Sequence, residues 1–219
     1  MWILSSILKP YRGMPKEIYI IFAARIIGAM GAFVAPLMTI IMTQSIGLSE
    51  GQAGFYLSLT GVAAGFGVIT GGKLVDRFGR KRIILLFSGL SLILYFRVAF
   101  LEPSLTMLHL LILAGALNTT TRPAYDSLIA DLTTPANRSG AYSLSYMGWN
   151  VGFAIGPILG GFLYRHHLPW VFLGESLAML LSLILIAFFI KETITRAQDE
   201  IEEEERHLER RVEGSIFKV

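Results

Sequence analysis

Six apolar stretches, each long enough to cross a lipid bilayer, follow one another through most of the 219-residue chain. A transmembrane helix needs about 20 mostly apolar residues. The stretches lie at 17–43, 51–73, 83–101, 105–132, 138–164 and 169–190. Lipid offers the backbone no hydrogen-bond partner, so stretches of this kind are expected to be helical. The sequence therefore predicts an all-α membrane protein, a bundle of six transmembrane helices.

Composition excludes several other classes of protein. Only 16% of the residues are charged, against about 25% in an ordinary soluble domain. The basic residues stand at the ends of the apolar stretches and form no continuous stripe, so we expect no binding of nucleic acid. The chain has no cysteine, which excludes thiolate metal sites and a cysteine nucleophile. No nucleophile–base set or phosphate-binding loop is visible, so we expect no enzyme activity, no cofactor and no metal.

The connections between the stretches predict the orientation in the membrane. They are short, so consecutive helices run antiparallel and six spans return the chain to its starting side. Lysine and arginine favour the cytoplasmic side. Arg165 is the single basic residue in the connections on one side, against nine on the other: Lys9, Arg12, Lys16, Lys73, Arg77, Arg80, Lys81, Arg82 and Arg138. We expect a multi-pass protein of the cell membrane with both termini cytoplasmic.

This reading divides the chain into three parts. Residues 1–16 form a cytoplasmic N-terminal segment, and residues 17–190 form the six-helix transmembrane domain. Residues 191–219 are highly charged and lack the apolar content to cross a bilayer. They are predicted to be a cytoplasmic tail or a linker between domains, with the charge run as a solvated face.

The connection between the second and third stretches, GGKLVDRFGRKR, has a distinctive pattern. Glycine at Gly79 permits a tight turn, and Asp76 at a helix end can meet a cation or the N-terminus of a neighbouring helix. The pattern resembles a signature of the major facilitator superfamily at this same loop, G-x-x-x-D-R-x-G-R-[KR]-[KR]. The matching residues are Gly72, Asp76, Arg77, Gly79, Arg80, Lys81 and Arg82. The resemblance implies a gate that latches the inward-closed state; the alternative is a topological anchor only.

Two further segments are similar to patterns of the same superfamily. At the end of the fourth stretch, LIADLTTPANRSGAYS places Asp131 and Arg138 on an acidic and a basic position, and Asp131 is expected to face Arg80 or Arg77. In the fifth stretch, GWNVGFAIGPILGG resembles the drug–proton antiporter branch, whose core is G-x-x-x-G-P-x-x-G-G. Its matching residues are Gly152, Gly156, Pro157, Gly160 and Gly161. Leu111 and Ala114, however, stand where that branch usually carries arginine and glutamine.

Polar and ionisable residues inside the apolar stretches are candidates for a proton or substrate site. They are costly in lipid and usually face an interior cavity or one another. The candidates are Arg25, Asn118, Arg122, Asp126, Asn150 and Glu175. Asp126 or Glu175 is a candidate proton carrier. Alternatively, Arg122 and Asp126, four residues apart on one helix face, form a static pair, and Glu175 reaches toward an interface.

The resemblance covers residues 17 to about 190, and the superfamily's fold has twelve spans in two halves. It implies a secondary transporter of which this chain is the N-terminal half, and we expect proton-coupled efflux of a small organic solute. Its partners are then the lipid bilayer, the solute, a proton, and a complementary C-terminal half or a second copy of the chain. The rival hypothesis is a non-transporting membrane protein, either truncated or dependent on a partner.

Overall fold

A computed structural model describes Tyr11 and residues 13–193. Most of the predicted N-terminal segment 1–16, and the predicted tail from residue 194 onward, lie outside the described residues. All regular elements of the described part are helical, and the predicted six-helix architecture is confirmed. The elements are α2 (Lys16–Met30), α3 (Val34–Ile40), the π-helical turn η2 (Ile41–Ser45), α4 (Glu50–Phe78), α5 (Arg80–Val98), α6 (Leu105–Thr119), α7 (Arg122–Asp131), α8 (Arg138–His166) and α9 (Leu168–Phe189).

The first and fourth spans are each interrupted. α2, α3 and η2 together make the first span, with a break at residues 31–33, and α6 and α7 make the fourth, with a break at Thr120 and Thr121. The sequence analysis predicted each of these spans as one continuous helix. A proline stands in the first turn after each break, Pro36 in α3 and Pro123 in α7, where its missing N–H costs little.

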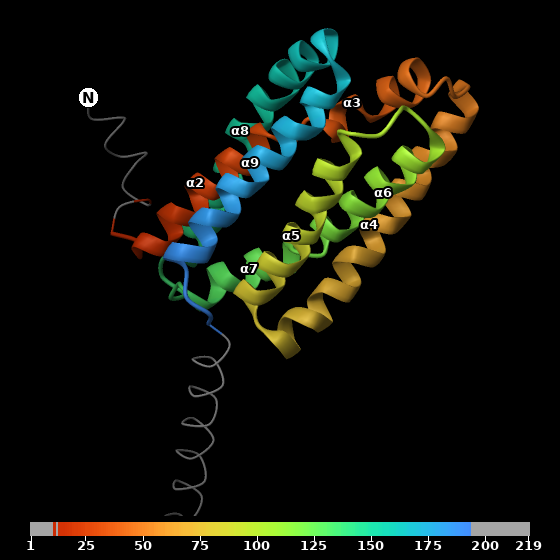
Figure 1. Cartoon of the computed structure of the whole chain (residues 1–219). Coiled ribbons are helices and arrows are strands. Elements are labelled where there is room, and N and C mark those ends of the chain that lie inside the picture. Colours follow the sequence, from red (N-terminus) through yellow and green to blue (C-terminus); the bar gives the residue numbers. More distant parts are fainter. Residues whose placement is uncertain (1–10, 12, 194–219) are drawn as a thin grey trace, which may run out of the picture.

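The helices form two groups that meet along α5 and α9 (Figure 1). α2 packs against α8 and α9, while α6 packs against α4 and α5. Exchanging spans one, two and three for spans four, five and six leaves this pattern of neighbours unchanged. The bundle therefore has an internal pseudo-symmetry that relates the two interrupted spans to each other.

Glycine lets α8 approach α2 closely. A Cβ atom at Gly152 would lie 2.7 Å from the Cβ of Ala29 and 2.9 Å from the nitrogen of Met30, distances that real side chains essentially never show. Gly148 and Gly156 face the same helix in the same way, whereas a Cβ at Gly161 would meet nothing within 4 Å. Small residues at intervals of four thus allow backbone contact between helices, and Gly161 takes no part in it.

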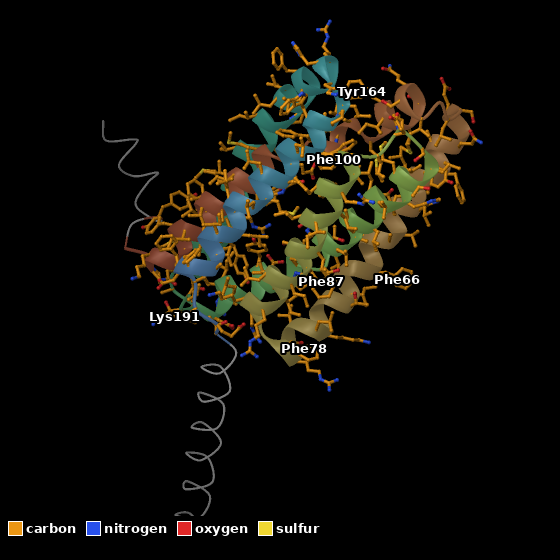
Figure 2. The ribbon with its side chains drawn as sticks, in the orientation of Figure 1. Phe66, Phe78, Phe87, Phe100, Tyr164 and Lys191 are labelled. Atoms are coloured by element: carbon orange, nitrogen blue, oxygen red, sulfur yellow. The ribbon has the colours of Figure 1, made fainter. Side chains whose placement is uncertain are left out.

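Three of the spans are helices long and apolar enough to cross a membrane by length and composition, namely Lys16–Ser45, Glu50–Phe78 and Leu168–Phe189. α5 carries four basic residues at its ends, and the fourth span is divided between two shorter helices. Large apolar side chains point outward along the bundle, as Phe66 does from α4 with 65% of its surface exposed (Figure 2). Such a surface suits a lipid environment.

Candidate gate and central cavity

One end of the bundle carries the loop between α4 and α5. Phe78 and Lys191 mark this end, and Phe100 and Tyr164 lie toward the other (Figure 2). Gly79 has φ +99°, a backbone conformation that residues other than glycine rarely adopt. A Cβ there would also lie 2.6 to 2.8 Å from the carboxylate of Glu192. Glycine is therefore required at this turn for both its backbone conformation and its lack of a side chain.

Glu192 caps the start of α5. Its carboxylate accepts the backbone N–H of Arg80 at 2.8 Å, of Lys81 at 3.4 Å and of Arg82 at 3.0 Å. These N–H groups have no partner within their own helix. Partial burial alone would raise the pKa of Glu192, but the backbone N–H groups of Arg82, Thr193, Arg80 and Lys81 together hold that pKa below its ordinary value. The carboxylate thus stays ionised near neutral pH.

An ion pair joins this cap to the end of α7. Arg80 Nε lies 2.9 Å from Asp131 Oδ2, and the Thr193 hydroxyl donates to the same oxygen at 2.6 Å. The Arg80 N–H is not aligned well enough to count as a hydrogen bond, so the contact is mainly electrostatic. We call Arg80, Asp131, Glu192 and Thr193 the gate cluster. It ties together α5, α7 and the chain that follows α9.

Other residues of the predicted gate lie around this cluster. Arg138 donates to the carbonyl oxygens of Ala130 and Thr133, both at 3.2 Å, and so closes the turn after α7. Lys81 donates to the carbonyl of Ala187 at 2.7 Å. Asp76 and Arg77 are exposed, and Asp76 has no ion-pair partner among the described residues. Gly72 faces open space. The structure thus brings only part of the motif together.

Glu192 was not among the residues predicted to form the gate. It was assigned to the charged segment that begins at residue 191, because a single acidic residue in a charged run has no special pattern. Its position directly after the sixth span was the available signal, since that span ends beside the start of α5. The cap itself depends on a contact between residues 110 to 112 positions apart.

The second group of polar residues lines two neighbouring hollows that share three lining residues. The smaller hollow is about 160 Å³ and is lined in part by Arg25, Asn118, Arg122, Tyr125 and Glu175. The larger is about 630 Å³, and Asp126 and Tyr142 line it. Arg25, Arg122 and Trp149 line both. We call the two hollows together the central cavity.

Five of the six predicted polar residues thus share one cavity, and Asn150 does not. Asn150 is exposed, and its amide donates to the carbonyl of Tyr146 one turn earlier, at 2.7 Å. The alternative of a static pair between Arg122 and Asp126 was wrong, because no ion pair joins them in the described residues. Arg122 is the first residue of α7, directly after the break, and both side chains are exposed to the cavity.

Glu175 is buried and stabilises the break in the first span. One oxygen, Oε2, accepts the backbone N–H groups of Phe33 at 3.1 Å and Val34 at 2.7 Å. Val34 begins α3, and its N–H has no partner within the helix, whereas the Phe33 N–H also donates to the carbonyl oxygen of Gly31 at 2.8 Å. The hydroxyl of Tyr95, from α5, lies beside the same carboxylate. The alternative that Glu175 reaches toward an interface was therefore wrong, because its carboxylate caps a helix inside the bundle.

Comparison with known proteins decides the family. The family model of the Major Facilitator Superfamily matches residues 20–218. The chain belongs to this superfamily. It is an integral membrane protein of a transporter family, and this membership gives no indication of enzyme activity.

The relatives of this chain have names that refer to different substances. The chain is 31% identical over 168 residues to a gallate transporter of Pseudomonas putida, covering 75% of this chain and 36% of that protein. It is 30% identical over 189 residues to the class H tetracycline resistance protein of Pasteurella multocida, covering 84% and 46%. A Na⁺, Li⁺, K⁺/H⁺ antiporter of Planococcus maritimus is 27% identical over 169 residues, with 74% and 39% covered. The chain spans less than half the length of these relatives.

Solved structures agree in fold. A peptide transporter, POT, in complex with sulfate superposes with a TM-score of 0.72 at 20% identity, over 94% of this chain and 46% of that one. The transporter FucP in its outward conformation gives 0.64 at 22% identity, over 78% and 41%. At these identities the likeness concerns the fold, which is that of one half of a superfamily transporter.

Proposed function

We propose that this chain is the N-terminal half of a secondary transporter that exports a small organic solute in exchange for protons. The central cavity carries the proposal, because it gathers Arg25, Arg122 and Asp126 between two interrupted spans. In superfamily transporters the substrate sits near the midplane between two halves, which rock against each other. The antiporter named among the relatives supports the coupling to an ion.

The proton carrier in this proposal is Asp126. Its carboxylate is exposed to the larger hollow and has no ion-pair partner among the described residues, so a proton from water can reach it. Glu175 is the second candidate, but its carboxylate already accepts two backbone N–H groups. Protonating Glu175 would weaken the cap of α3. Glu175 would therefore affect coupling by changing the stability of the break in the first span.

The test uses proteoliposomes that hold this chain joined to a second six-span half, with a pH-sensitive dye inside. We expect movement of solute together with movement of protons under a pH gradient. Asp76→Asn should remove most of this transport while membrane abundance stays normal, because the charge of Asp76 is available for a partner in the second half. Glu102→Gln, an exposed acidic residue at the opposite end of the bundle, serves as the control.

Each possible failure of this test has a distinct meaning. Solute movement without protons would contradict the coupling, and normal transport by Asp76→Asn would contradict the gating role of that residue. The isolated 219-residue chain should move no solute, because its cavity is open where the other half would close it. Transport by the isolated chain would contradict the need for a complementary half or a second copy.

The proposal places both termini in the cytoplasm of the cell. The nine-to-one distribution of basic residues between the connections supports this orientation. Reporter fusions after Val219 should give a cytoplasmic signal, and fusions within 165–168 should give an external one. An external signal after Val219 would contradict the orientation.

A further inference from the structure

Arg25 is an incompletely compensated cation inside the bundle. Its side chain leaves α2 about two turns after the helix begins, and its Nε atom is buried without a hydrogen-bond partner in the described residues. Its guanidinium carbon lies 4.3 Å from the centre of the Tyr125 ring. This contact stabilises the face of the guanidinium, but the N–H groups lie in the plane of the group and still need acceptors.

A second arginine shares the cavity with Arg25. Arg122 starts α7, lines both hollows and is exposed within them. In the described part of the chain, neither arginine has a nitrogen atom within 4.0 Å of a carboxylate oxygen, the limit for an ion pair. Two guanidinium groups thus line the hollows, and neither forms an ion pair with an acidic group in the part of the chain that the structure describes.

The acidic groups of the cavity form no ion pair with these arginines in the described residues. Glu175 lines the smaller hollow, but the oxygen Oε2 of its carboxylate accepts two backbone N–H groups. Asp126 lines only the larger hollow and lies outside ion-pair distance of both arginines. The two hollows are thus lined by two arginines and two carboxylates, and one of these carboxylates, that of Glu175, is held by backbone N–H groups. The start of α7, at Arg122, adds the positive end of a helix dipole to the same wall.

The wall beside these cations is aromatic. Trp149 lines both hollows, Tyr125 lines the smaller one, and Tyr142 and Tyr146 line the larger one. Aromatic side chains offer a large flat apolar surface with polar edges. A planar apolar body and a carboxylate would therefore find complementary surfaces side by side.

We propose that the central cavity binds a small organic anion, a carboxylate on a flat apolar body, through Arg25 and Arg122. The inference rests on the proposed transport function and names the chemical class of the solute. Guanidinium groups bind carboxylates through paired, charge-assisted N–H bonds. Such a ligand would bond to the terminal nitrogens of Arg25, which are not buried and have no hydrogen-bond partner among the described residues.

The test measures binding to the 219-residue chain in nanodiscs of phosphatidylcholine alone, which excludes competing anionic lipids. The probes are benzoate, benzamide and benzylammonium, which share a ring and differ in charge. Tryptophan fluorescence reports binding, and Trp149→Phe should abolish the signal because Trp149 lines both hollows. Benzoate should bind at least about tenfold more tightly than the other two, because each charge-assisted bond to a guanidinium favours the anion.

Three arginine variants separate anion recognition from folding. Arg25→Gln and Arg122→Gln should each weaken benzoate binding about tenfold or more and should weaken benzamide binding less, because the charge-assisted bonds are formed with the anion alone. Arg97→Gln is the matched control, because Arg97 is exposed and lines neither hollow. Arg122→Gln provides the same test if Arg25→Gln fails to fold, since Arg122 is already exposed.

Other outcomes overturn the proposal. Tighter binding of benzylammonium or benzamide would refute the anionic class and leave solute transport standing. The absence of binding by all three probes would also refute it, because the proposal requires this cavity to hold a carboxylate on a ring. The proteoliposome assay is independent of these probes, so a failed transport assay would not be confused with a failed anion site.

Discussion

Replacing Gly152 with leucine should prevent assembly of α8 on α2. The new side chain would begin within 3 Å of the Cβ of Ala29 and the nitrogen of Met30, and closer still to the carbonyl of Ile26. A backbone atom cannot move aside as a flexible side chain can. Overpacking of about 3 kcal/mol changes the folding equilibrium roughly a hundredfold, so we expect little monodisperse chain after extraction in mild detergent.

Gly161→Leu is the matched control for this prediction. Gly161 lies on the same helix, and a Cβ there meets nothing within 4 Å. Leucine is also a better helix former than glycine, so the control should match or exceed the wild-type yield. Equal yields for the two variants on size-exclusion chromatography would show that close contact of α2 and α8 is not needed for folding.

Replacing Glu175 with leucine should also strongly destabilise the bundle. The change removes the acceptor of the buried Val34 N–H and leaves the Phe33 N–H with the carbonyl oxygen of Gly31 alone, at 2.8 Å. One buried unsatisfied group costs about 1–3 kcal/mol, and the expected loss is of that order. Thermal unfolding followed by tryptophan fluorescence should show a large fall in the midpoint.

Two variants define what this loss depends on. Glu175→Gln keeps an oxygen that can accept both N–H groups, so it should unfold near the wild-type temperature. Ser176→Ala removes the next residue's hydroxyl, which bonds only to Phe172 in its own helix at 2.8 Å, and should have a small effect. If Glu175→Leu unfolds at the wild-type temperature, Glu175 does not stabilise the break.

The sequence was sufficient to predict six spans because apolar length is a local property. The breaks at Gly31 and Thr120 were not predictable in the same way. The first depends on Glu175, which lies 141 and 142 residues away from the groups that it caps. Gly28 and Gly31 were visible as small residues, but glycine alone does not distinguish a break from close packing against Ala178.

The candidate site was predicted with similar limits. Polar residues in apolar stretches indicated the central cavity, because such residues rarely face lipid. The spacing of Arg122 and Asp126 predicted a pair on one helix face, and both residues do lie on α7, but no ion pair joins them in the described residues. Which residues of a motif make contacts, as Arg80 does and Asp76 does not, depends on tertiary structure. Spacing alone does not contain that information.

Glu192 attaches the segment that leaves α9 to the first turn of α5. The residues that leave α9 are held by the first turn of α5 and by Asp131 before the chain continues. A pull on the chain beyond Thr193 therefore loads Arg80 and Asp131 directly, rather than unwinding the last turn of α9. The length and stiffness of whatever is attached after Thr193 would then set how easily the gate cluster separates.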